Sequence, residues 1–321
     1  MPVIALLAPK QRSETVFVQR HFDRLRTIGM LVDARFADGA NEVLDRLSDV
    51  ECVLSTWGMP KLDESLLARM PRLRAVFYGA SSVKGFVTPA MWARGIVVSS
   101  SAMANAVAVA EYTVAVIMLS NKRFWAMMRS SRHVAVPGNY RRTVGIIGAS
   151  LVGREVIRRL KGNNLDLLLY DPFVDSAEAV RLGVKKSELP ELMSESDVVS
   201  LHAPNLPGLR HMINAGMLAR MRDGATFINT ARGAMVDEKA LIAELETGRL
   251  FAVLDVSDPE PPVAGSPLFS LPNVIFTPHI AGAMGQECQR LADFAIDELE
   301  RFLAGQPLQN PVTREVLDKL A

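Results

Sequence analysis

Short apolar runs alternate with stretches of helical length along most of the chain. In the first hundred residues, four such runs predict buried strands, at residues 3–7, 52–55, 75–78 and 96–99. The stretches between them predict helices at residues 13–28, 40–47 and 63–70. Strands that alternate with helices are typical of a parallel sheet covered on both faces. The pattern therefore predicts an α/β protein whose first part is one small doubly wound unit.

A second alternating series begins at Thr143. It predicts six further strands, enough for a sheet of dinucleotide-binding size, at residues 144–147, 167–170, 198–201, 226–229, 252–254 and 274–276. Between the two series, residues 106–120 are apolar apart from Glu111 and predict a helix buried on nearly all sides, as at a domain junction.

Three further segments complete the pattern. Residues 129–142 contain several arginines without clear periodicity and predict an exposed crossing between domains, with anion binding as the alternative. Residues 286–304 predict a long amphipathic helix, and residues 312–320 predict one more helix that returns toward the first domain.

Composition narrows the class of partner. A chain of 321 residues suggests two domains of roughly 150 residues each. With 36 basic and 35 acidic side chains the net charge is +1, which provides no basic field for nucleic acid and favours a small-molecule partner. The only cysteines, Cys52 and Cys288, show no metal-binding or disulfide spacing. We therefore expect no metal site and a reducing, cytoplasmic environment.

Membrane association is not expected. The apolar residues 1–8 lack a basic leader and predict a first strand rather than a signal peptide. No apolar run reaches the roughly 18 to 20 residues that cross a bilayer.

A glycine turn after the strand at 144–147 indicates a dinucleotide site. Gly148 and Gly153 occupy the first and third places of a G-x-G-x-x-G fingerprint. Ser150 occupies the second place, where glycine normally lets the backbone approach the pyrophosphate, and Leu151 and Val152 begin the helix. The alternative is an ordinary glycine-rich turn between a strand and a helix.

Asp171 strengthens the dinucleotide interpretation. It follows Gly153 by 18 residues, at the end of the apolar run 167–170, and is followed by Pro172. A carboxylate here can accept the ribose hydroxyl groups and repels a 2′-phosphate, so NAD is favoured over NADP. The alternative role for Asp171 is that of a turn residue before proline.

The ends of three later strands offer chemistry. Arg232 follows the strand at 226–229, Asp255 the strand at 252–254 and His279 the strand at 274–276. An arginine can bind a carboxylate bidentately, a histidine exchanges protons near neutral pH, and Glu260 can favour the charged imidazolium. Together they suit reversible chemistry on a hydroxy or keto acid. Taken singly, each also has a plain reading: a surface arginine, a loop acid and a turn histidine.

These motifs resemble the D-isomer-specific 2-hydroxyacid dehydrogenase family. The similar stretches are Val109-Ala110-Glu111, the glycine turn with Asp171-Pro172, residues 196–204, Asn229-Thr230-Ala231-Arg232-Gly233, Val236-Asp237-Glu238, Asp255-Val256, Glu260-Pro261 and Thr277-Pro278-His279. The resemblance implies a Rossmann NAD-binding domain, residues 105–288, inserted in a flavodoxin-like substrate domain made of residues 1–104 and 289–321.

The resemblance also implies roles for individual residues. Arg232 is similar to the family's substrate-carboxylate clamp, His279 to its proton donor and acceptor, and Glu260 to the acid paired with that histidine. Asp255 resembles the residue that meets the nicotinamide carboxamide. The remaining cofactor contacts are implied, mostly through main chain, for His202, Ala203, Pro204, Thr230, Ala231 and Ala281.

The resemblance is weaker in the expected substrate loop, residues 79–85. Ala80, Ser81 and Ser82 are expected to bind the substrate carboxylate, although Ser82 stands near a position where the family has glycine. Lys84 stands near an expected acid; it is either a second anion-binding group, for a phosphate for example, or a solvated loop lysine. Trp57 is either an apolar wall of the substrate site or a core residue.

The sequence thus predicts a cytoplasmic, homodimeric, NAD-dependent enzyme that interconverts a 2-hydroxy acid and its 2-oxo acid. The alternative is an NAD(H)-sensing binding protein of the same fold without significant turnover.

Overall fold

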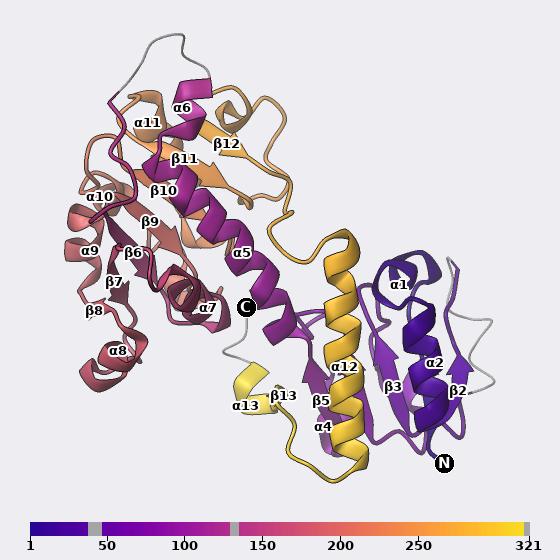
Figure 1. Ribbon diagram of the computed structural model, residues 1–321. Coiled ribbons are helices and arrows are strands. Elements are labelled where there is room, and N and C mark those ends of the chain that lie inside the picture. Colours follow the sequence, from indigo (N-terminus) through magenta and orange to yellow (C-terminus); the bar gives the residue numbers. More distant parts are fainter. Residues whose placement is uncertain (38–46, 129–134, 318–321) are drawn as a thin grey trace. The chain divides into compact units, whose positions relative to one another are not determined.

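The computed structural model describes residues 1–37, 47–128 and 135–317, and it divides into two compact units (Figure 1). Unit 1 comprises Met1–Asn105 and Ala283–Leu320, and unit 2 comprises Ala106–Gly282. The helix predicted over residues 40–47 falls, except for its last residue, outside the described part of the chain.

Unit 1 is built on a six-stranded sheet with the order β13-β5-β4-β3-β1-β2. All pairs are parallel except β13 with β5. Its strands are β1 (Val3–Leu6), β2 (Met30–Asp33), β3 (Cys52–Ser55), β4 (Ala75–Tyr78), β5 (Val97–Ser100) and β13 (Pro311–Val312). Without β13, the order 2-1-3-4-5 is that of a flavodoxin-like sheet.

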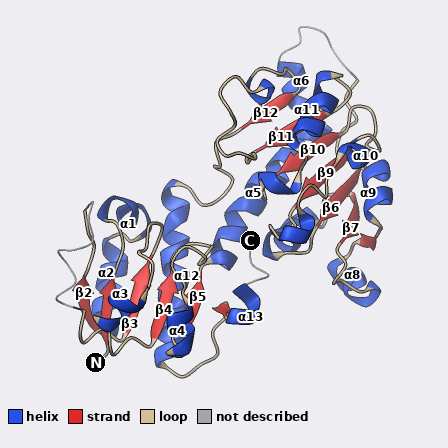
Figure 2. Cartoon of the chain, turned by 180° about the vertical axis from the view of Figure 1, so that it is seen from behind, coloured by secondary structure: helices blue, strands red, loops and turns tan. Residues whose placement is uncertain are grey.

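Helices cover both faces of this sheet. They are α1 (Lys10–Val16), α2 (Gln19–Ile28), α3 (Glu64–Ala68), α4 (Pro89–Ala93), α12 (Cys288–Leu303) and α13 (Arg314–Leu317). Helices α2 and α12 lie in front of the sheet in Figure 1, whereas α3 and α4 lie in front of it in Figure 2, which is seen from behind. Val53, Val76 and Val98 of the strands pack with Leu67 of α3 and Met91 of α4 in one buried cluster.

Unit 2 is built on a seven-stranded parallel sheet with the order β12-β11-β10-β9-β6-β7-β8. The strands are β6 (Thr143–Ile147), β7 (Asp166–Tyr170), β8 (Lys185–Lys186), β9 (Val198–Leu201), β10 (Thr226–Asn229), β11 (Phe251–Leu254) and β12 (Val274–Phe276). Numbered along the unit, this is the order 3-2-1-4-5-6 of a Rossmann sheet with one added strand. The predicted α/β class, with its two parallel sheets, is confirmed.

The helices of unit 2 form two layers. They are α5 (Ala102–Asn121, of which the first four residues belong to unit 1), α6 (Phe124–Met128), α7 (Leu151–Leu160), α8 (Ser176–Leu182), α9 (Leu189–Glu195), α10 (Ala215–Leu218) and α11 (Glu238–Glu246). Leu167 and Leu169 pack with residues of α5 and α7, whereas Leu168 packs with residues of α9, α10 and α11. Successive residues of a strand point to opposite faces, so these buried strands are apolar throughout.

Two helices differ from the sequence prediction. The helix predicted over 13–28 is two helices, because the chain is extended at Phe17 and Val18. Helix α5 is longer than predicted, since Ala102, Met103 and Ala104 continue it toward the N-terminus. At 20 residues it meets the length and composition of a membrane span, so the expectation that no stretch does so was wrong. A core helix passes the same test.

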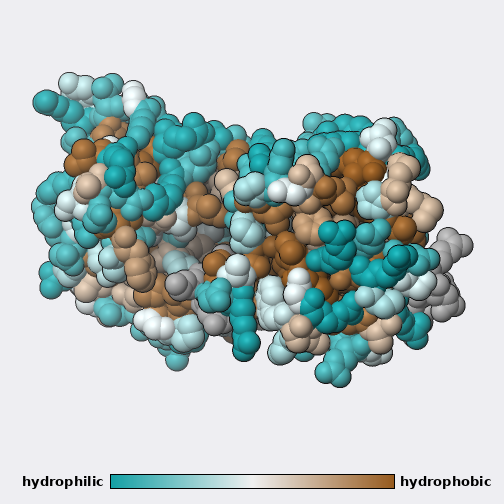
Figure 3. All heavy atoms as spheres, turned by 90° about the horizontal axis from the view of Figure 1, so that it is seen from below, coloured by the Kyte–Doolittle hydropathy of each residue, from teal (hydrophilic) through white to brown (hydrophobic). Residues whose placement is uncertain are grey.

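Charged and polar side chains share the surface with apolar ones. Figure 3 shows one face of the molecule, on which hydrophilic residues alternate with patches of hydrophobic ones. Among the described residues, the most exposed large apolar side chains of unit 2 include Phe173 and Val180. Phe173 directly follows Asp171-Pro172, so one of these exposed groups adjoins the expected ribose site.

Candidate functional site

The turn after β6 is shaped by glycine. Gly148 has a positive φ of 96°, and a Cβ added there would lie 2.6 Å from the amide nitrogen of Ala203 and 2.8 Å from its Cα. Only glycine therefore lets this turn approach the segment after β9 so closely. The His202 amide donates a hydrogen bond to the carbonyl of Ile147, which fixes the same two segments together.

Ser150 begins helix α7 in an extended conformation, with φ at −64°, so this position does not need the conformational freedom of glycine. Its hydroxyl accepts a hydrogen bond from the Gly153 amide as an N-cap. The amides of Leu151 and Val152 stand in the first turn of the helix, where backbone donors have no partner within the helix. An anionic pyrophosphate suits these donors, and the helix dipole adds to the attraction.

Asp171 closes the other side of this turn. Its carboxylate accepts hydrogen bonds from the amides of Ala149 at 2.7 Å and Phe173 at 2.8 Å. The first bond ties the end of β7 to the glycine turn, and the second is the local turn contact that the plain reading of Asp171 anticipated. Carboxylate oxygens accept more than one hydrogen bond, so a ribose hydroxyl group can share them. The turn therefore fits a dinucleotide.

His202 is held as a neutral, structural group. The imidazole is buried, and its Nε2 lies 2.8 Å from Ser200 Oγ. Burial lowers its pKa to about 3, so it carries no charge at neutral pH. Its contribution to the expected cofactor cleft, like that of buried Ala203 and half-buried Pro204, is therefore through main chain and shape.

The loop after β10 is braced from within. The side chain of Asn229 accepts a hydrogen bond from the Ala231 amide and donates one to the Arg232 carbonyl, both at 3.0 Å. A Cβ on Gly233 would lie 2.0 Å from the Ser257 carbonyl carbon, so glycine is required where this loop meets the loop after β11. Thr230 is buried, with Oγ1 3.3 Å from that of Thr113 on α5.

Arg232 lies in the electrostatic field of Glu260. Its Nη1 donates a 2.6 Å hydrogen bond to the Ala231 carbonyl. Burial lowers the pKa of this guanidinium below its usual value, and the Glu260 carboxylate opposes the shift. An arginine remains charged under such shifts, so the group is a partly desolvated cation whose remaining N–H donors suit a carboxylate.

Asp255 organises the loop after β12. It is 1% exposed, and its two carboxylate oxygens accept hydrogen bonds from the amides of Ile280 and Ala281, each at 2.8 Å. The Thr277 hydroxyl donates a third bond at 2.7 Å, and the Asp255 carbonyl accepts the His279 amide at 3.0 Å. The family resemblance implied that Asp255 contacts the nicotinamide. In the structure its carboxylate binds the backbone amides after His279 and the Thr277 hydroxyl before it.

This loop is also tied to helix α5. The hydroxyl of Tyr112 lies 3.0 Å from Thr277 Oγ1, which in turn donates to Asp255. Burial raises the pKa of Tyr112, so its hydroxyl keeps its proton and can donate to Thr277. Tyr112, Thr277 and Asp255 form one polar chain from the long helix to the histidine loop.

Glu260 and His279 are in direct contact. Nδ1 of His279 lies 2.5 Å from Oε1 of Glu260, with the side chains 48% and 39% exposed. His279 has a positive φ of 57°, and its amide donates to the carbonyls of both Asp255 and Thr277. The left-handed backbone conformation therefore sets the direction in which the His279 side chain leaves the main chain, and Glu260 contacts one nitrogen of the ring. Nε2 stays available to exchange a proton with a substrate.

In unit 1, the loops after β3 and β4 carry the residues expected at the substrate. Thr56 donates from Oγ1 to the Gly79 carbonyl at 2.9 Å, which joins the two loops. Ala80 is buried, and Trp57 packs partly buried against the core of this unit, so the core role anticipated for Trp57 is present. Within the described chain, the amides of Ser81 and Ser82 donate no hydrogen bond.

Several residues of the site escaped the sequence prediction. Asn229, Gly233, Tyr112 and Thr277 brace the functional loops but carry no unusual chemistry of their own. Asn229 and Gly233 stand in a motif that sequence analysis did single out, yet only the fold shows what they contact. Over the described ranges, no group of three or more His, Cys, Asp or Glu residues is arranged to hold a metal ion.

The Rossmann sheet, the glycine turn and the acid at the end of β7 define a dinucleotide-binding protein. Residues 103–281 match the family model described as D-isomer specific 2-hydroxyacid dehydrogenase, NAD binding domain. The chain belongs to the D-isomer specific 2-hydroxyacid dehydrogenase family, which confirms the resemblance seen in the sequence, and its expected cofactor is a nicotinamide dinucleotide.

Individual relatives agree with this assignment. An (S)-sulfolactate dehydrogenase from Chromohalobacter salexigens is 32% identical over 88% of this chain and 94% of its own length. A D-3-phosphoglycerate dehydrogenase from Archaeoglobus fulgidus is 28% identical over 90% of this chain but only 56% of its own. The chain spans little more than half the length of such phosphoglycerate dehydrogenases.

Solved structures share the fold. The TT0316 protein from Thermus thermophilus superposes with a TM-score of 0.75 at 28% identity, covering 98% of this chain and all of that one. A D-mandelate dehydrogenase from Rhodotorula graminis gives a TM-score of 0.80 at 23% identity over 98% of both chains, a likeness of fold alone.

Proposed function

We propose that this protein is an NAD-dependent dehydrogenase that interconverts a small 2-hydroxy acid and its 2-oxo acid. The observation that carries the proposal is the 2.5 Å contact between Glu260 and His279 in a unit that also holds Arg232 and a dinucleotide turn. A carboxylate that holds Nδ1 orients the imidazole ring and leaves Nε2 to exchange a proton with the substrate.

In the reductive direction, Arg232 binds the carboxylate of the 2-oxo acid and fixes its orientation. The bound nicotinamide supplies the hydride. His279 donates the proton that the developing alkoxide needs, and Glu260 stabilises the imidazolium before the transfer. Oxidation runs through the same groups in reverse, with neutral His279 accepting the hydroxyl proton.

Asp255 acts, in this proposal, as a positioning residue. Its carboxylate accepts hydrogen bonds from the amides of Ile280 and Ala281 and from the Thr277 hydroxyl, and these bonds hold the loop around His279. A proton donor misplaced by about 1 Å can lose roughly a hundredfold in rate, so such bracing matters to catalysis. The earlier expectation of a nicotinamide contact remains a prediction for the cofactor-bound protein.

The loop at residues 79–85 is proposed to bind the substrate through main chain. The unpaired amides of Ser81 and Ser82 are suitable donors to a carboxylate. Lys84 adds positive charge to this loop, which suits substrates with a second anionic group. Two of the relatives above are named for such acids, phosphoglycerate and sulfolactate.

The decisive experiment measures NADH consumption with a panel of 2-oxo acids, and NAD reduction with 2-hydroxy acids. The panel pairs acids that lack a second anion, such as glyoxylate and pyruvate, with phosphoglycerate and sulfolactate. We expect turnover with at least one compound and faster turnover with NADH than with NADPH. Tight NADH binding without any turnover would instead support the NAD(H)-sensing alternative.

We also propose a cytoplasmic homodimer. Both cysteines are buried and unpaired, and burial raises the pKa of Cys52 to about 12, which suits a reducing compartment without thiol chemistry. Helix α5 is long and apolar, and its side chains include the exposed Met103, so it is our candidate for the interface with a second copy. Sedimentation velocity of the purified protein measures the oligomeric state directly.

A further inference from the structure

Unit 2 has a polar cavity at the N-terminal ends of its strands, opposite the strand ends that carry the candidate site. It has a volume of about 280 Å³ and is lined by the end of α5, the start of β6 and the segments before β9 and β10. Strands β6, β9 and β10 are parallel neighbours, and their other ends carry the glycine turn, His202 and Arg232. The cavity is therefore separate from the dehydrogenase chemistry.

Four buried polar atoms at this cavity make no hydrogen bond within the described residues. Ser120 Oγ, Asn121 Nδ2, Arg123 Nε and Arg142 Nε are buried atoms without a hydrogen-bond partner in the described structure. Asn121 is 3% exposed and Ser120 is 7% exposed. Buried donors without acceptors are costly and uncommon in folded proteins. Since three of these four atoms can only donate, the missing partner is a group rich in acceptors.

The ion pairs around the cavity also indicate a site for an anion. Arg142 pairs with Asp197, and Nη1 of Arg222 lies 3.7 Å from the same carboxylate. Asp223 is engaged by Arg249. Arg123 has no carboxylate partner among the residues that the structure describes, so one guanidinium at the cavity is left without a counterion.

The position of Arg123 is built into the fold. The residue follows α5 with a positive φ of 48°, and a Cβ added to Gly224 would lie 2.7 Å from its Nη2. A side chain at 224 would displace the guanidinium, and Gly224 itself has a positive φ of 77°. The absence of a side chain at Gly224 thus leaves room for the guanidinium of Arg123 at the cavity.

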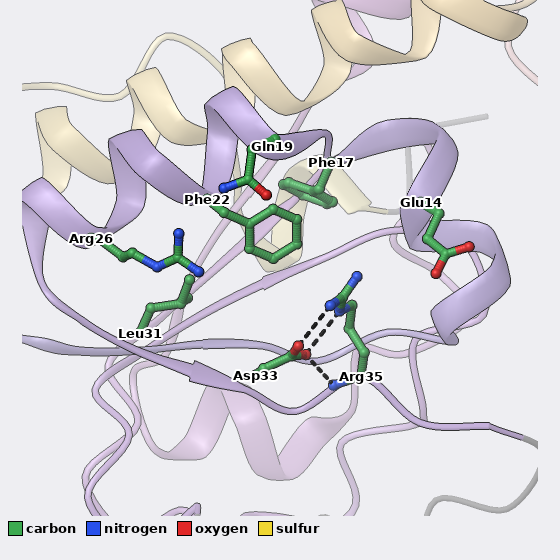
Figure 4. Close-up of a pocket in the computed structure, with 8 residues that line it drawn as sticks. All are labelled: Glu14, Phe17, Gln19, Phe22, Arg26, Leu31, Asp33 and Arg35. Atoms are coloured by element: carbon green, nitrogen blue, oxygen red, sulfur yellow. Dashed lines mark hydrogen bonds and ion pairs between the residues drawn. The ribbon is translucent and has the colours of Figure 1, made fainter.

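The cavity of unit 1 provides a contrast (Figure 4). It has a volume of about 340 Å³ and contains two arginines, but both have acidic partners. Arg35 makes a bidentate contact with Asp33, at 2.8 and 2.6 Å, and Arg26 lies 3.0 Å from Asp23. Because both arginines are already paired with acids, the cavity of unit 1 has no uncompensated arginine to attract an anion.

We propose that the cavity of unit 2 is a binding site for a small oxyanion of the phosphate, sulfate or carboxylate class. Arg123 supplies the uncompensated charge, and Asn121, Ser120 and Arg142 supply the additional donors. Binding satisfies buried groups at the N-terminal ends of three adjacent strands, so it stabilises unit 2. It leaves the glycine turn, His202 and Arg232, at the opposite ends of those strands, untouched.

The test is isothermal titration calorimetry of the full-length protein with inorganic phosphate at constant ionic strength, repeated with sulfate, acetate and chloride. The variants are Arg123→Gln and, as matched control, Lys122→Gln, which removes a neighbouring exposed charge that does not line the cavity. We expect saturable phosphate binding to the wild type and the control, and at least tenfold weaker binding to Arg123→Gln, as for loss of a charged hydrogen bond.

An Arg232→Gln variant separates the two anion sites. If phosphate binds at the proposed cavity, its affinity survives in Arg232→Gln and falls in Arg123→Gln. Equal affinity in Arg123→Gln and Lys122→Gln overturns the proposal. So does a loss of binding confined to Arg232→Gln, or binding by chloride as strong as by phosphate.

Two further measurements keep the result interpretable. Should Arg123→Gln fail to fold, judged by circular dichroism, Asn121→Ala replaces it, and we again expect weaker phosphate binding. Sedimentation velocity with and without phosphate tests whether a second copy fills the cavity instead. If the cavity is buried in a dimer and phosphate does not bind, the oxyanion proposal is wrong.

Discussion

The loops at the C-terminal strand ends differ between the two units. In unit 2, these loops present charged groups, and hydrogen bonds from Asn229 and Asp255 fix the backbone around them. In unit 1, the loops after β3 and β4 are joined by the Thr56 hydroxyl, and Ser81 and Ser82 offer main-chain amides. In the proposed reaction, the strand ends of unit 2 would supply charge and proton transfer, while those of unit 1 would supply main-chain donors beside Lys84. Parallel sheets of similar architecture thus carry different chemical groups at their strand ends.

The largest expected effect follows from His279→Gln. Removing the proton donor should lower kcat by about 100- to 10,000-fold, the usual contribution of general acid and base catalysis. His211→Gln is the matched control, because His211 is an exposed histidine that also has a positive φ, of 54°. An unchanged kcat in His279→Gln would show that His279 is not the proton donor. The proposed difference between the strand-end loops of the two units would then lose its main support.

Arg232→Gln should act mainly on binding. A charged hydrogen bond contributes about 1.5–3 kcal/mol, so we expect the KM for the 2-oxo acid to rise by roughly ten- to a hundredfold. Arg220→Gln, at an exposed site on the same unit, should leave KM unchanged. Steady-state kinetics with saturating NADH distinguishes the two variants. A normal KM in Arg232→Gln would give carboxylate recognition to unit 1 instead.

Asp171→Ala tests the cofactor side of unit 2. Loss of the carboxylate should weaken NADH binding by about tenfold and narrow the preference for NADH over NADPH, since a repulsive charge is also removed. Asp166→Ala, at the other end of the same strand and exposed, is the control. Fluorescence titration with both cofactors measures the effect. A wild type that already prefers NADPH would refute the role given to Asp171.

Ser82→Gly should have the smallest effect. The proposed contact of this residue is its amide, which the variant retains, so KM should change by no more than about twofold. Kinetics alongside Arg232→Gln makes the comparison direct. A shift as large as that of Arg232→Gln would show that the serine side chain itself recognises the substrate.

The sequence predicted best those elements that depend on a local pattern of residues. The strands at 52–55, 75–78, 198–201 and 226–229 have the predicted bounds, because fully buried parallel strands are short, mainly apolar runs. The edge strand at 274–276, which is partly buried, also has the predicted bounds. Strand β2 was missed since its four residues are all partly or fully exposed, and β8 since it consists of two lysines. The break at Phe17 and Val18 has no glycine or proline to mark it.

Long-range contacts account for what the sequence could not show at the site. The prediction placed Arg232 and His279 at strand ends and paired Glu260 with His279, and the structure has Glu260 and His279 in contact. It could not pair Tyr112 with Thr277, which are 165 residues apart, or assign Asp255 its loop contacts. The cavity beside Arg123 combines residues from distant segments of the chain, and only the fold brings them together.

The exposure of Glu260 and His279 affects how the protein exchanges protons with its surroundings. Because both side chains are more than a third exposed, solvent reaches the pair directly. In the proposed reaction, the histidine would therefore exchange its proton with water without a relay of buried groups through the interior. The acid that holds the loop of the histidine, Asp255, is by contrast buried, and its carboxylate accepts hydrogen bonds from the Ile280 and Ala281 amides of that loop.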